Sequence, residues 1–281
     1  MLIVFRLTGQ FRMVSPWGYI LLVLYLAAAG LYYLFFFDYK EREAQIARAV
    51  LIVLLTLHLG LIVIHSLATD RPPLASRAEA LSVTAWCLGA MYLAVEVLSR
   101  RAEFGGFVMS LAAALQFLSL LHRIPAKVPP ALDNPGFVMH AWMNIMAYSG
   151  FFLSFLFSIL YLVMRSELKA HNPGWLSRRL PSMQTLDIMS AHSTTVGFVL
   201  LTAGLIAGAF WAKSQWGYFF KADPKLLASV AVWLIYGAYM LVRAFRVGSY
   251  RLLAFLSVFG FCAIIFSFVL VHGLGQSVHR F

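Results

Sequence analysis

The chain has 281 residues, of which 62% are hydrophobic and only 12% carry a charge. An average soluble domain has roughly 25% charged residues, so this chain lacks the side chains for a water-facing shell. The composition excludes a soluble enzyme, a nucleic-acid-binding domain and a disordered chain. The net charge of +11 does not indicate DNA binding, because the basic residues of a membrane protein gather in loops beside lipid head groups.

Eight stretches of the chain are apolar enough to cross a bilayer, which takes roughly 20 residues in a helix. They comprise residues 17–37, 49–69, 80–98, 104–121, 136–164, 193–212, 226–242 and 252–271. None shows the alternation of polar and apolar residues that is typical of membrane strands. The sequence therefore predicts an all-α fold, a polytopic membrane bundle of about eight transmembrane helices with both termini on one side.

Residues near the ends of these stretches give three smaller predictions. The apolar residues 1–16, which contain two arginines, are too short to span and are expected to form an interfacial helix. Glu96 lies four residues before Arg100, so the two are expected to pair at the membrane interface. Cys87 and Cys262 belong to no redox or haem-attachment motif and are expected to pack as apolar side chains.

Tryptophans and histidines are distributed unevenly between the two sides of the membrane. All but one of the seven tryptophans fall toward the side that holds the termini. These are Trp17, Trp86, Trp142, Trp211, Trp216 and Trp233, whereas Trp175 lies opposite. The terminus side also has His65, His122, His140, His272 and His279; His58 is placed mid-membrane, and His171 and His192 on the opposite side.

This distribution is typical of a site for haem, because aromatic rings stack on the macrocycle and two imidazoles can ligate its iron. Basic residues on the same side would pair with the propionates. They are Arg123, Lys127, Lys213, Lys221, Lys225 and Arg280. The alternative is that each tryptophan anchors a helix at the interface and each histidine is a solvated loop residue.

A loop between the sixth and seventh stretches carries a family resemblance. Residues 216–226 read WGYFFKADPKL. They resemble the tryptophan-rich loop WGxxWxWDPKE of the cytochrome c assembly family, which includes the CcsA/ResC component of cytochrome c synthetase and HemX-type relatives. Trp216–Gly217 and Asp223–Pro224–Lys225 match this pattern. Asp-Pro is also a good signal for the start of the next helix.

Two further segments resemble the family at its histidine positions. Residues 138–164 begin VMH and look like the helix with the first external haem ligand, which maps onto His140. Residues 271–279 look like the closing segment, whose last histidine is the second ligand and maps onto His279. The resemblance implies b-type, non-covalently bound haem between these histidines, beneath the loop. The implied cofactor-binding residues are Trp211, Trp216, Gly217, Phe219, Phe220, Asp223, Pro224 and Lys225.

The resemblance also implies the setting of the protein. It covers residues 71–281, a cytochrome c assembly-like membrane domain, and leaves residues 1–70 as an interfacial segment with two helices. Haem would be presented on the non-cytoplasmic face of the inner (cytoplasmic) membrane to apocytochrome c, with a partner membrane protein and no nucleic acid. Both termini would then be non-cytoplasmic. Any enzymatic role would be as part of a cytochrome c haem-lyase complex, because the sequence shows no catalytic constellation of its own.

Departures from the family pattern keep two alternatives open. Phe220 and Ala222 stand in place of two loop tryptophans, and Leu241 stands where synthetases have an intramembrane histidine. HemX-like relatives share these departures, so a non-catalytic subunit that regulates or stabilises a haem-biosynthesis complex is one alternative. The other is a b-type haem electron-transfer subunit, because His58 and His65 are seven residues apart on one helix face.

Overall fold

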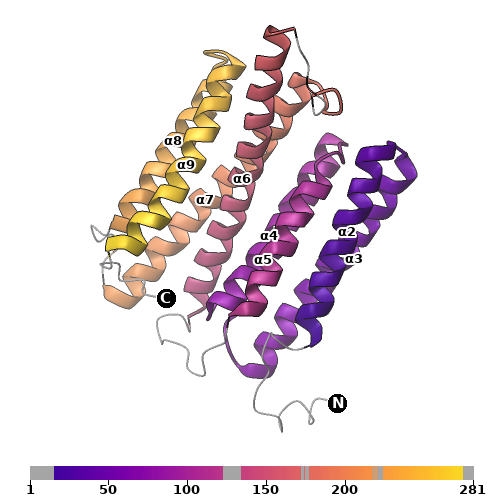
Figure 1. Ribbon diagram of the computed structural model, residues 1–281. Coiled ribbons are helices and arrows are strands. Elements are labelled where there is room, and N and C mark those ends of the chain that lie inside the picture. Colours follow the sequence, from indigo (N-terminus) through magenta and orange to yellow (C-terminus); the bar gives the residue numbers. More distant parts are fainter. Residues whose placement is uncertain are drawn as a thin grey trace. The chain divides into compact units, whose positions relative to one another are not determined.

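The computed structural model describes residues 16–122, 134–171, 177–217 and 224–274, together with residues 174 and 219. In these residues the regular structure is entirely helical (Figure 1). The helices are α2 (Pro16–Asp38), α3 (Glu41–Thr69), α4 (Arg77–Ser99), α5 (Gly105–Leu121), α6 (Pro135–Lys169), α7 (Met183–Trp216), α8 (Pro224–Ala244) and α9 (Tyr250–Leu274). The predicted all-α membrane bundle is confirmed.

Seven of these helices are long and apolar enough to cross a membrane, and α5 is a shorter apolar helix of 17 residues. The protein is therefore a multi-pass integral membrane protein. α6 has 35 residues and α7 has 34, so each is about 50 Å long at about 1.5 Å per residue. Both helices exceed a hydrocarbon core of about 30 Å and must extend beyond it.

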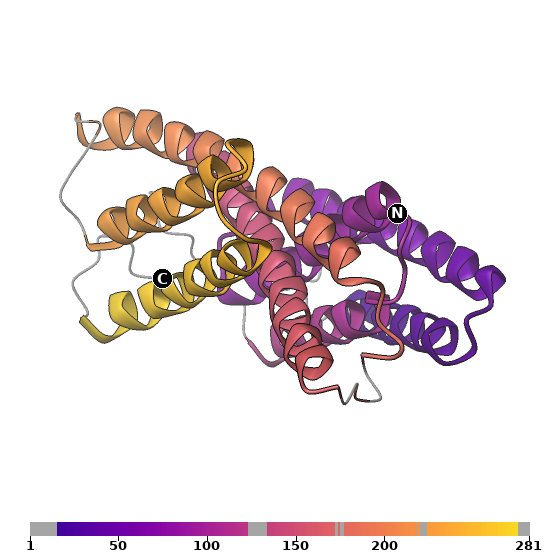
Figure 2. The same ribbon diagram turned by 90° about the horizontal axis from the view of Figure 1, so that it is seen from above.

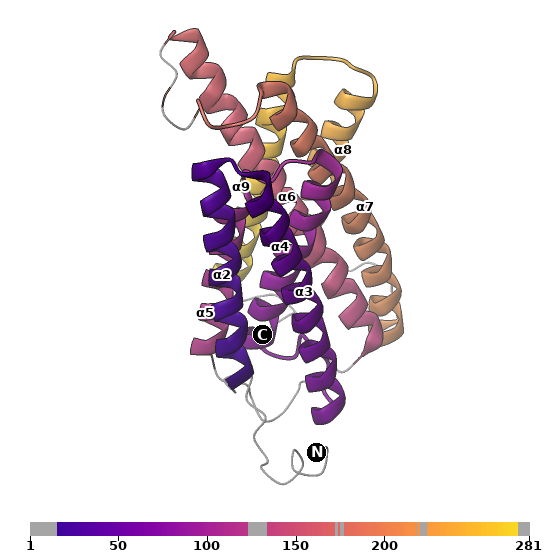
Figure 3. The same cartoon turned by 90° about the vertical axis from the view of Figure 1, so that its right-hand side faces the viewer.

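The chain forms two compact units, Met1–Ala141 and Trp142–Phe281. Unit 1 contains α2, α3, α4 and α5, and Figure 3 shows α2 and α5 side by side within it. Unit 2 contains α7, α8, α9 and most of α6, and Figure 2 shows α8 and α9 side by side. The domain boundary at residue 70 stays a prediction.

A ring of hydrogen bonds joins all four helices of unit 1. The Tyr25 hydroxyl on α2 lies 3.0 Å from Nδ1 of His58 on α3, and His58 Nε2 lies 3.0 Å from the Ser82 hydroxyl on α4. Ser82 donates to Gln116 Oε1 on α5 at 2.8 Å, and Gln116 Nε2 donates back to the carbonyl of Gly18 on α2 at 3.4 Å. The four side chains are buried among apolar residues, so each polar group depends on its partner in the ring.

The donors in this hydrogen-bond ring follow one direction. Ser82 has a single hydroxyl proton, and it is given to Gln116. Ser82 must therefore accept the proton of His58 Nε2, which makes Nδ1 the acceptor of the Tyr25 hydroxyl. His58 is held as the neutral Nε2–H tautomer with both nitrogens in use.

The prediction that Glu96 pairs with Arg100 is wrong. Glu96 is fully buried, accepts from Arg48 Nε on α3 at 2.7 Å and accepts from the Tyr32 hydroxyl on α2 at 2.6 Å. Arg100 follows the last residue of α4 with a φ of +56°, so it has left the helix and lost the i,i+4 geometry. Glu96 is thus a junction between three helices rather than an interfacial residue.

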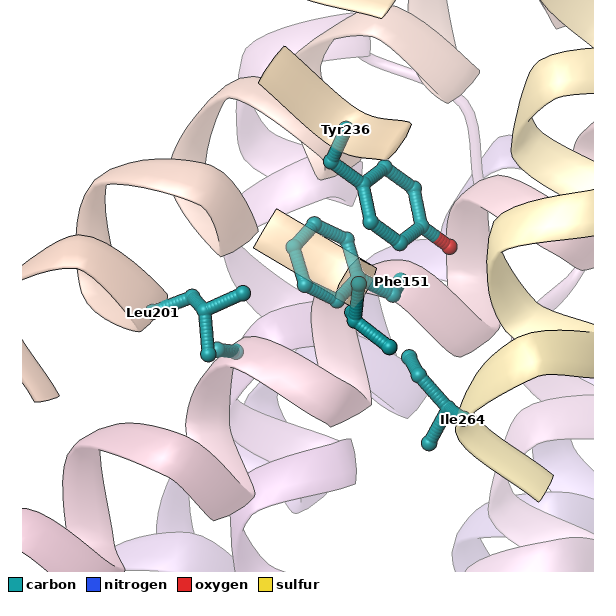
Figure 4. Packing of buried hydrophobic residues seen from close by; sticks show 6 residues of the cluster. Phe151, Leu201, Tyr236 and Ile264 are labelled. Carbon is teal, nitrogen blue, oxygen red and sulfur yellow. The ribbon is translucent and has the colours of Figure 1, made fainter. Parts of the chain in front are cut away.

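Unit 2 packs around a pair of stacked aromatic rings. The Phe151 ring on α6 and the Tyr236 ring on α8 are parallel within 6°, with centroids 3.6 Å apart. Leu201 of α7 and Ile264 of α9 pack in the same cluster, so each of the four helices of unit 2 contributes to it (Figure 4). α7 approaches α6 closely here, because Gly197 has no side chain to hold Phe151 away.

A cluster of buried hydroxyls joins three helices of unit 2. Ser154 of α6 lies within 2.6–2.8 Å of Ser190 and Thr194 of α7 and of Ser257 of α9. Ser158 extends this hydroxyl cluster, 3.0 Å from Ser190. Because lipid offers no hydrogen-bond partners, such side chains must satisfy one another between the helices.

Candidate functional site

The family-like loop begins with a sharp turn at the end of α7. The helix ends at Trp216, and Gly217 follows with a φ of +81° and donates its N–H to the Lys213 carbonyl at 2.9 Å. Glycine is favoured in this left-handed C-cap because a Cβ would be strained there. The predicted Trp216–Gly217 motif therefore marks the point at which the chain leaves the helix.

Phe219 lies against the last turns of α7. Its ring meets the Phe210 ring edge-on at a centroid distance of 5.9 Å, and Lys213 Nζ lies 4.3 Å from the Phe219 centroid. All three side chains are exposed. An ammonium group beside apolar rings suits a flat apolar ligand with carboxylate groups, since the rings contact its face and the cation pairs with its charge.

Trp211 is buried and therefore does not form the exposed surface on which a haem would stack. Only 5% of its side chain is exposed. It can thus support the last turns of α7 from beneath, where Phe210 and Lys213 lie on the surface.

His140 lies in the second turn of α6 and is half-buried. Asn144 follows one turn later on the same helix face, where α6 and α7 come close together. A Cβ on Gly204 of α7 would lie only 2.7 Å from Asn144 Oδ1. The small residue at 204 thus places the face of α6 that carries Asn144 directly against α7.

α8 begins at Pro224, as the Asp-Pro sequence predicts. Phe220, Asp223 and His279 lie outside the described residues, and so do the side chains of Trp216, Pro224 and Lys225. The contributions of these residues to a haem site stay predictions.

Within the described residues, no group of three or more histidine, cysteine or acidic side chains is placed to hold a bare metal ion. Haem has a different requirement, because porphyrin nitrogens already surround the iron and only one or two axial ligands are needed. Single imidazoles beside aromatic and basic residues therefore suit haem better than a free ion.

The two histidines of α3 do not suit a b-type haem site. Both ring nitrogens of His58 are in the hydrogen-bond ring, so neither is available to iron. His65 Nε2 lies 3.3 Å from Glu79, which also bonds Ser76, the N-cap of α4. Both histidines join helices of unit 1.

His192, predicted to lie outside the sixth crossing on the side opposite the termini, is part of a helix. The hydropathy pattern starts the sixth crossing at residue 193, but α7 begins at Met183, where the Ser182 hydroxyl accepts the Thr185 N–H at 3.2 Å. His192 therefore lies in the third turn of the helix. A cap residue three positions before Thr185 is the sequence signal that would have found this start.

Comparison with known proteins agrees with the resemblance noted in the sequence. The family model described as Cytochrome C assembly protein matches residues 17–279 and so includes α2 and α3. The chain is 27% identical to the cytochrome c biogenesis protein CcsA of Gloeobacter violaceus, over 79% of this chain and 82% of the relative. It is 27% identical to CcsA of Synechococcus sp. (strain CC9902), over 98% of both chains. CcsA of Guillardia theta is 28% identical, over 74% of this chain and 76% of the relative. The chain therefore belongs to the cytochrome C assembly protein family and has its role in cytochrome c biogenesis.

Proposed function

We propose that this protein holds haem, bound non-covalently, at the loop end of unit 2 and presents it for cytochrome c assembly. The observation that carries the proposal is the surface formed by Phe210 and Lys213 on the last turns of α7 and by Phe219 just after the Trp-Gly turn. The rings would contact the porphyrin face, and Lys213 would pair with a propionate.

His140 and His279 are the proposed axial ligands. His140 is carried by α6, a continuous helix whose next turn is held against α7 at Gly204. A ligand on a rigid helix keeps the iron in one position, which the transfer of haem to another protein requires. When bound, haem would supply the vinyl groups that receive the cysteine thiols of the apocytochrome.

The proposed setting follows the family. The protein would lie in the inner (cytoplasmic) membrane with both termini on the non-cytoplasmic side, where the loop of residues 216–225 would face apocytochrome c. A second membrane protein would complete the machine. The helix directions support a loop at one surface of unit 2, because α7 ends and α8 begins at the same end of this unit (Figure 1).

The experiment is to purify the protein in detergent and to measure haem by its optical spectrum and by the pyridine haemochrome. The wild type is expected to carry haem, and the His140→Ala/His279→Ala double variant is expected to lose it. His122→Ala is the matched control, because His122 Nδ1 lies 2.9 Å from the Leu118 carbonyl of its own helix. Wild type without haem, or a double variant with unchanged haem at this site, would reject the proposal.

One observation favours a second function, that of a HemX-like subunit that stabilises a haem-biosynthesis complex without ligating haem. Leu241 of α8 is 59% exposed, so the position at which synthetases have an intramembrane histidine presents only hydrocarbon. Under this alternative, the purified protein would retain a soluble biosynthetic enzyme and would contain no haem.

A further inference from the structure

An apolar groove runs along the surface of unit 1 between α3 and α4. Its volume of about 590 Å³ lies within the range of about 300–1,000 Å³ that is usual for small-molecule sites. Ile52 and Leu59 of α3 and Val97 and Leu98 of α4 line it and are 38–59% exposed. The groove is therefore open along its length and is not an enclosed cavity.

The polar groups that line the groove are bonded to the helix backbone. The Thr56 hydroxyl donates to the Ile52 carbonyl of its own helix at 2.8 Å. The Trp86 indole N–H on α4 donates to the Leu55 carbonyl of α3, also at 2.8 Å. The other lining residues are apolar, so the walls of the groove suit a hydrocarbon occupant.

The groove is about as long as one leaflet of a bilayer. It follows α4 from Trp86 to Leu98, which is about 18 Å at about 1.5 Å per residue. One leaflet is half of a hydrocarbon core of about 30 Å. Trp86 lies near the middle of α4 (Arg77–Ser99), so the groove runs from mid-membrane to one surface. A single acyl chain has this extent, whereas a transmembrane helix of a partner would need a surface across both leaflets.

The surface end of the groove is marked by an arginine on α3. Ile52, Thr56 and Leu59 line the groove at helical spacing, and Arg48 precedes Ile52 by one turn on the same helix face. The Arg48 side chain is 36% exposed and uses Nε to donate to Glu96 at 2.7 Å. Its two terminal amino groups have no partner among the described residues and can bind an anion at the groove mouth.

Two more arginines follow the other wall of the groove. Arg100 and Arg101 come directly after α4, within three residues of Leu98, and both are exposed. The nearby carboxylates are withdrawn from the surface, since Glu96 is fully buried and Glu103, 3.4 Å from Arg101 Nη1, is 6% exposed. Three guanidinium groups thus reach this end of the groove, while the two carboxylates that pair with them lie inside unit 1.

The other charges at this end of unit 1 balance one another. Lys40 pairs with Asp38 at 2.9 Å and with Glu43 at 3.7 Å. Glu41 and Arg42, both exposed, are adjacent at the start of α3. The excess positive charge is therefore contributed by the arginines at the groove mouth.

We propose that this groove binds an anionic phospholipid, with one acyl chain between α3 and α4 and the phosphate at Arg48, Arg100 and Arg101. Guanidinium groups bind phosphate oxygens through paired, charge-assisted hydrogen bonds. Basic residues at a membrane surface also attract anionic lipids in preference to zwitterionic ones. The site lies within unit 1 and requires no haem, so it is independent of the proposed function.

The test is native mass spectrometry of the full-length protein, released from detergent and titrated with palmitoyl-oleoyl phosphatidylglycerol or palmitoyl-oleoyl phosphatidylcholine. The wild type is expected to retain one phosphatidylglycerol, with a dissociation constant about tenfold lower than for phosphatidylcholine. Ala94→Phe should abolish this retention, because Ala94 lines the groove and is exposed, so the added ring fills the groove rather than the protein interior. Ile64→Phe is the matched control, since Ile64 is 57% exposed on α3 and lies outside the groove.

A second variant tests the head-group contact separately. Arg100→Gln/Arg101→Gln leaves the groove intact and is expected to bind the two lipids with equal affinity. Arg246→Gln/Arg251→Gln, which removes two exposed charges from unit 2, should keep the preference for phosphatidylglycerol.

Three results would overturn the proposal. The first is phosphatidylglycerol retained by Ala94→Phe as in the wild type, and the second is a preference for phosphatidylglycerol that is unchanged in Arg100→Gln/Arg101→Gln. The third is a protein dimer that dissociates in Ala94→Phe, which would identify a second copy of the chain as the occupant. If Ala94→Phe does not stay monodisperse, the arginine variant alone decides the outcome.

Discussion

Gly197→Ala tests whether the close packing of α7 against α6 can accommodate an added methyl group. The added Cβ would lie 2.9 Å from two ring carbons of Phe151 and 3.1 Å from the Ala147 carbonyl oxygen of α6. Neither can easily retreat, because the Phe151 ring is stacked on Tyr236 at 3.6 Å and the carbonyl is part of a helix backbone. Overpacking of this kind costs about 1–3 kcal/mol, while alanine gains about 1 kcal/mol over glycine in helix propensity.

Gly237→Ala in α8 is the matched control. There the nearest atom, Cε2 of Phe198, would be 3.7 Å from the added Cβ, which is an ordinary contact. This variant should keep the gain of about 1 kcal/mol from propensity without an overpacking cost. The two alanine variants should therefore differ in stability by about 1–3 kcal/mol, with Gly197→Ala the weaker.

The assay is the fraction of protein that remains monodisperse by size-exclusion chromatography after heating in detergent, measured over a range of temperatures. Gly197→Ala should lose half of its folded protein at a lower temperature than Gly237→Ala. Equal midpoint temperatures for the two variants would refute the reasoning, because they would show that the packing around Phe151 can rearrange without a loss of stability.

Three further predictions concern polar contacts and the loop turn. Ser154→Ala removes three interhelical hydrogen bonds. Because such bonds contribute about 0.6 kcal/mol each in membranes, the free energy of unfolding should fall by about 2 kcal/mol. The control Ser193→Ala loses only a bond to its own helix and should change the free energy of unfolding little. Glu96→Leu leaves Arg48 without its partner and should cost about 1–3 kcal/mol in the same heating assay; unchanged stability would show that the pair is dispensable. Gly217→Ala should be strained by about 1–2 kcal/mol at its positive φ and should weaken haem binding in detergent titrations. Gly217→Asn should be tolerated, because asparagine adopts this conformation more readily. Equal haem affinities for the two variants would contradict this account of the turn.

Hydropathy predicted the number of helices because a helix in lipid must bond its own backbone and present apolar side chains outward. It did not predict where α7 begins. Asp187 and Ser190 look like loop residues, yet each is paired across helices inside unit 2. Tertiary partners permit polar residues in a membrane helix, and those partners cannot be recognised from local hydropathy.

Charge pairing was predicted poorly for a related reason. Glu96 has a basic residue four positions later, but its true partners, Tyr32 and Arg48, are 64 and 48 residues away. Local spacing identifies partners only while the helix continues. The loop motif was more informative, because Trp216–Gly217 and Pro224 mark the end of one helix and the start of the next through backbone preferences that act locally.

The hydrogen-bond ring of unit 1 has a consequence for how the protein is made. Its members enter the membrane in the order Gly18, Tyr25, His58, Ser82 and Gln116, because the chain is synthesised from the N-terminus. Until Gln116 arrives with α5, the Ser82 proton and the Gly18 carbonyl have no partner within the ring. The ring therefore closes only when all four helices are inserted in the correct register. A slip of one turn in any helix would separate two of its bonds, so only the completed bundle in its correct register satisfies every donor and acceptor of the ring.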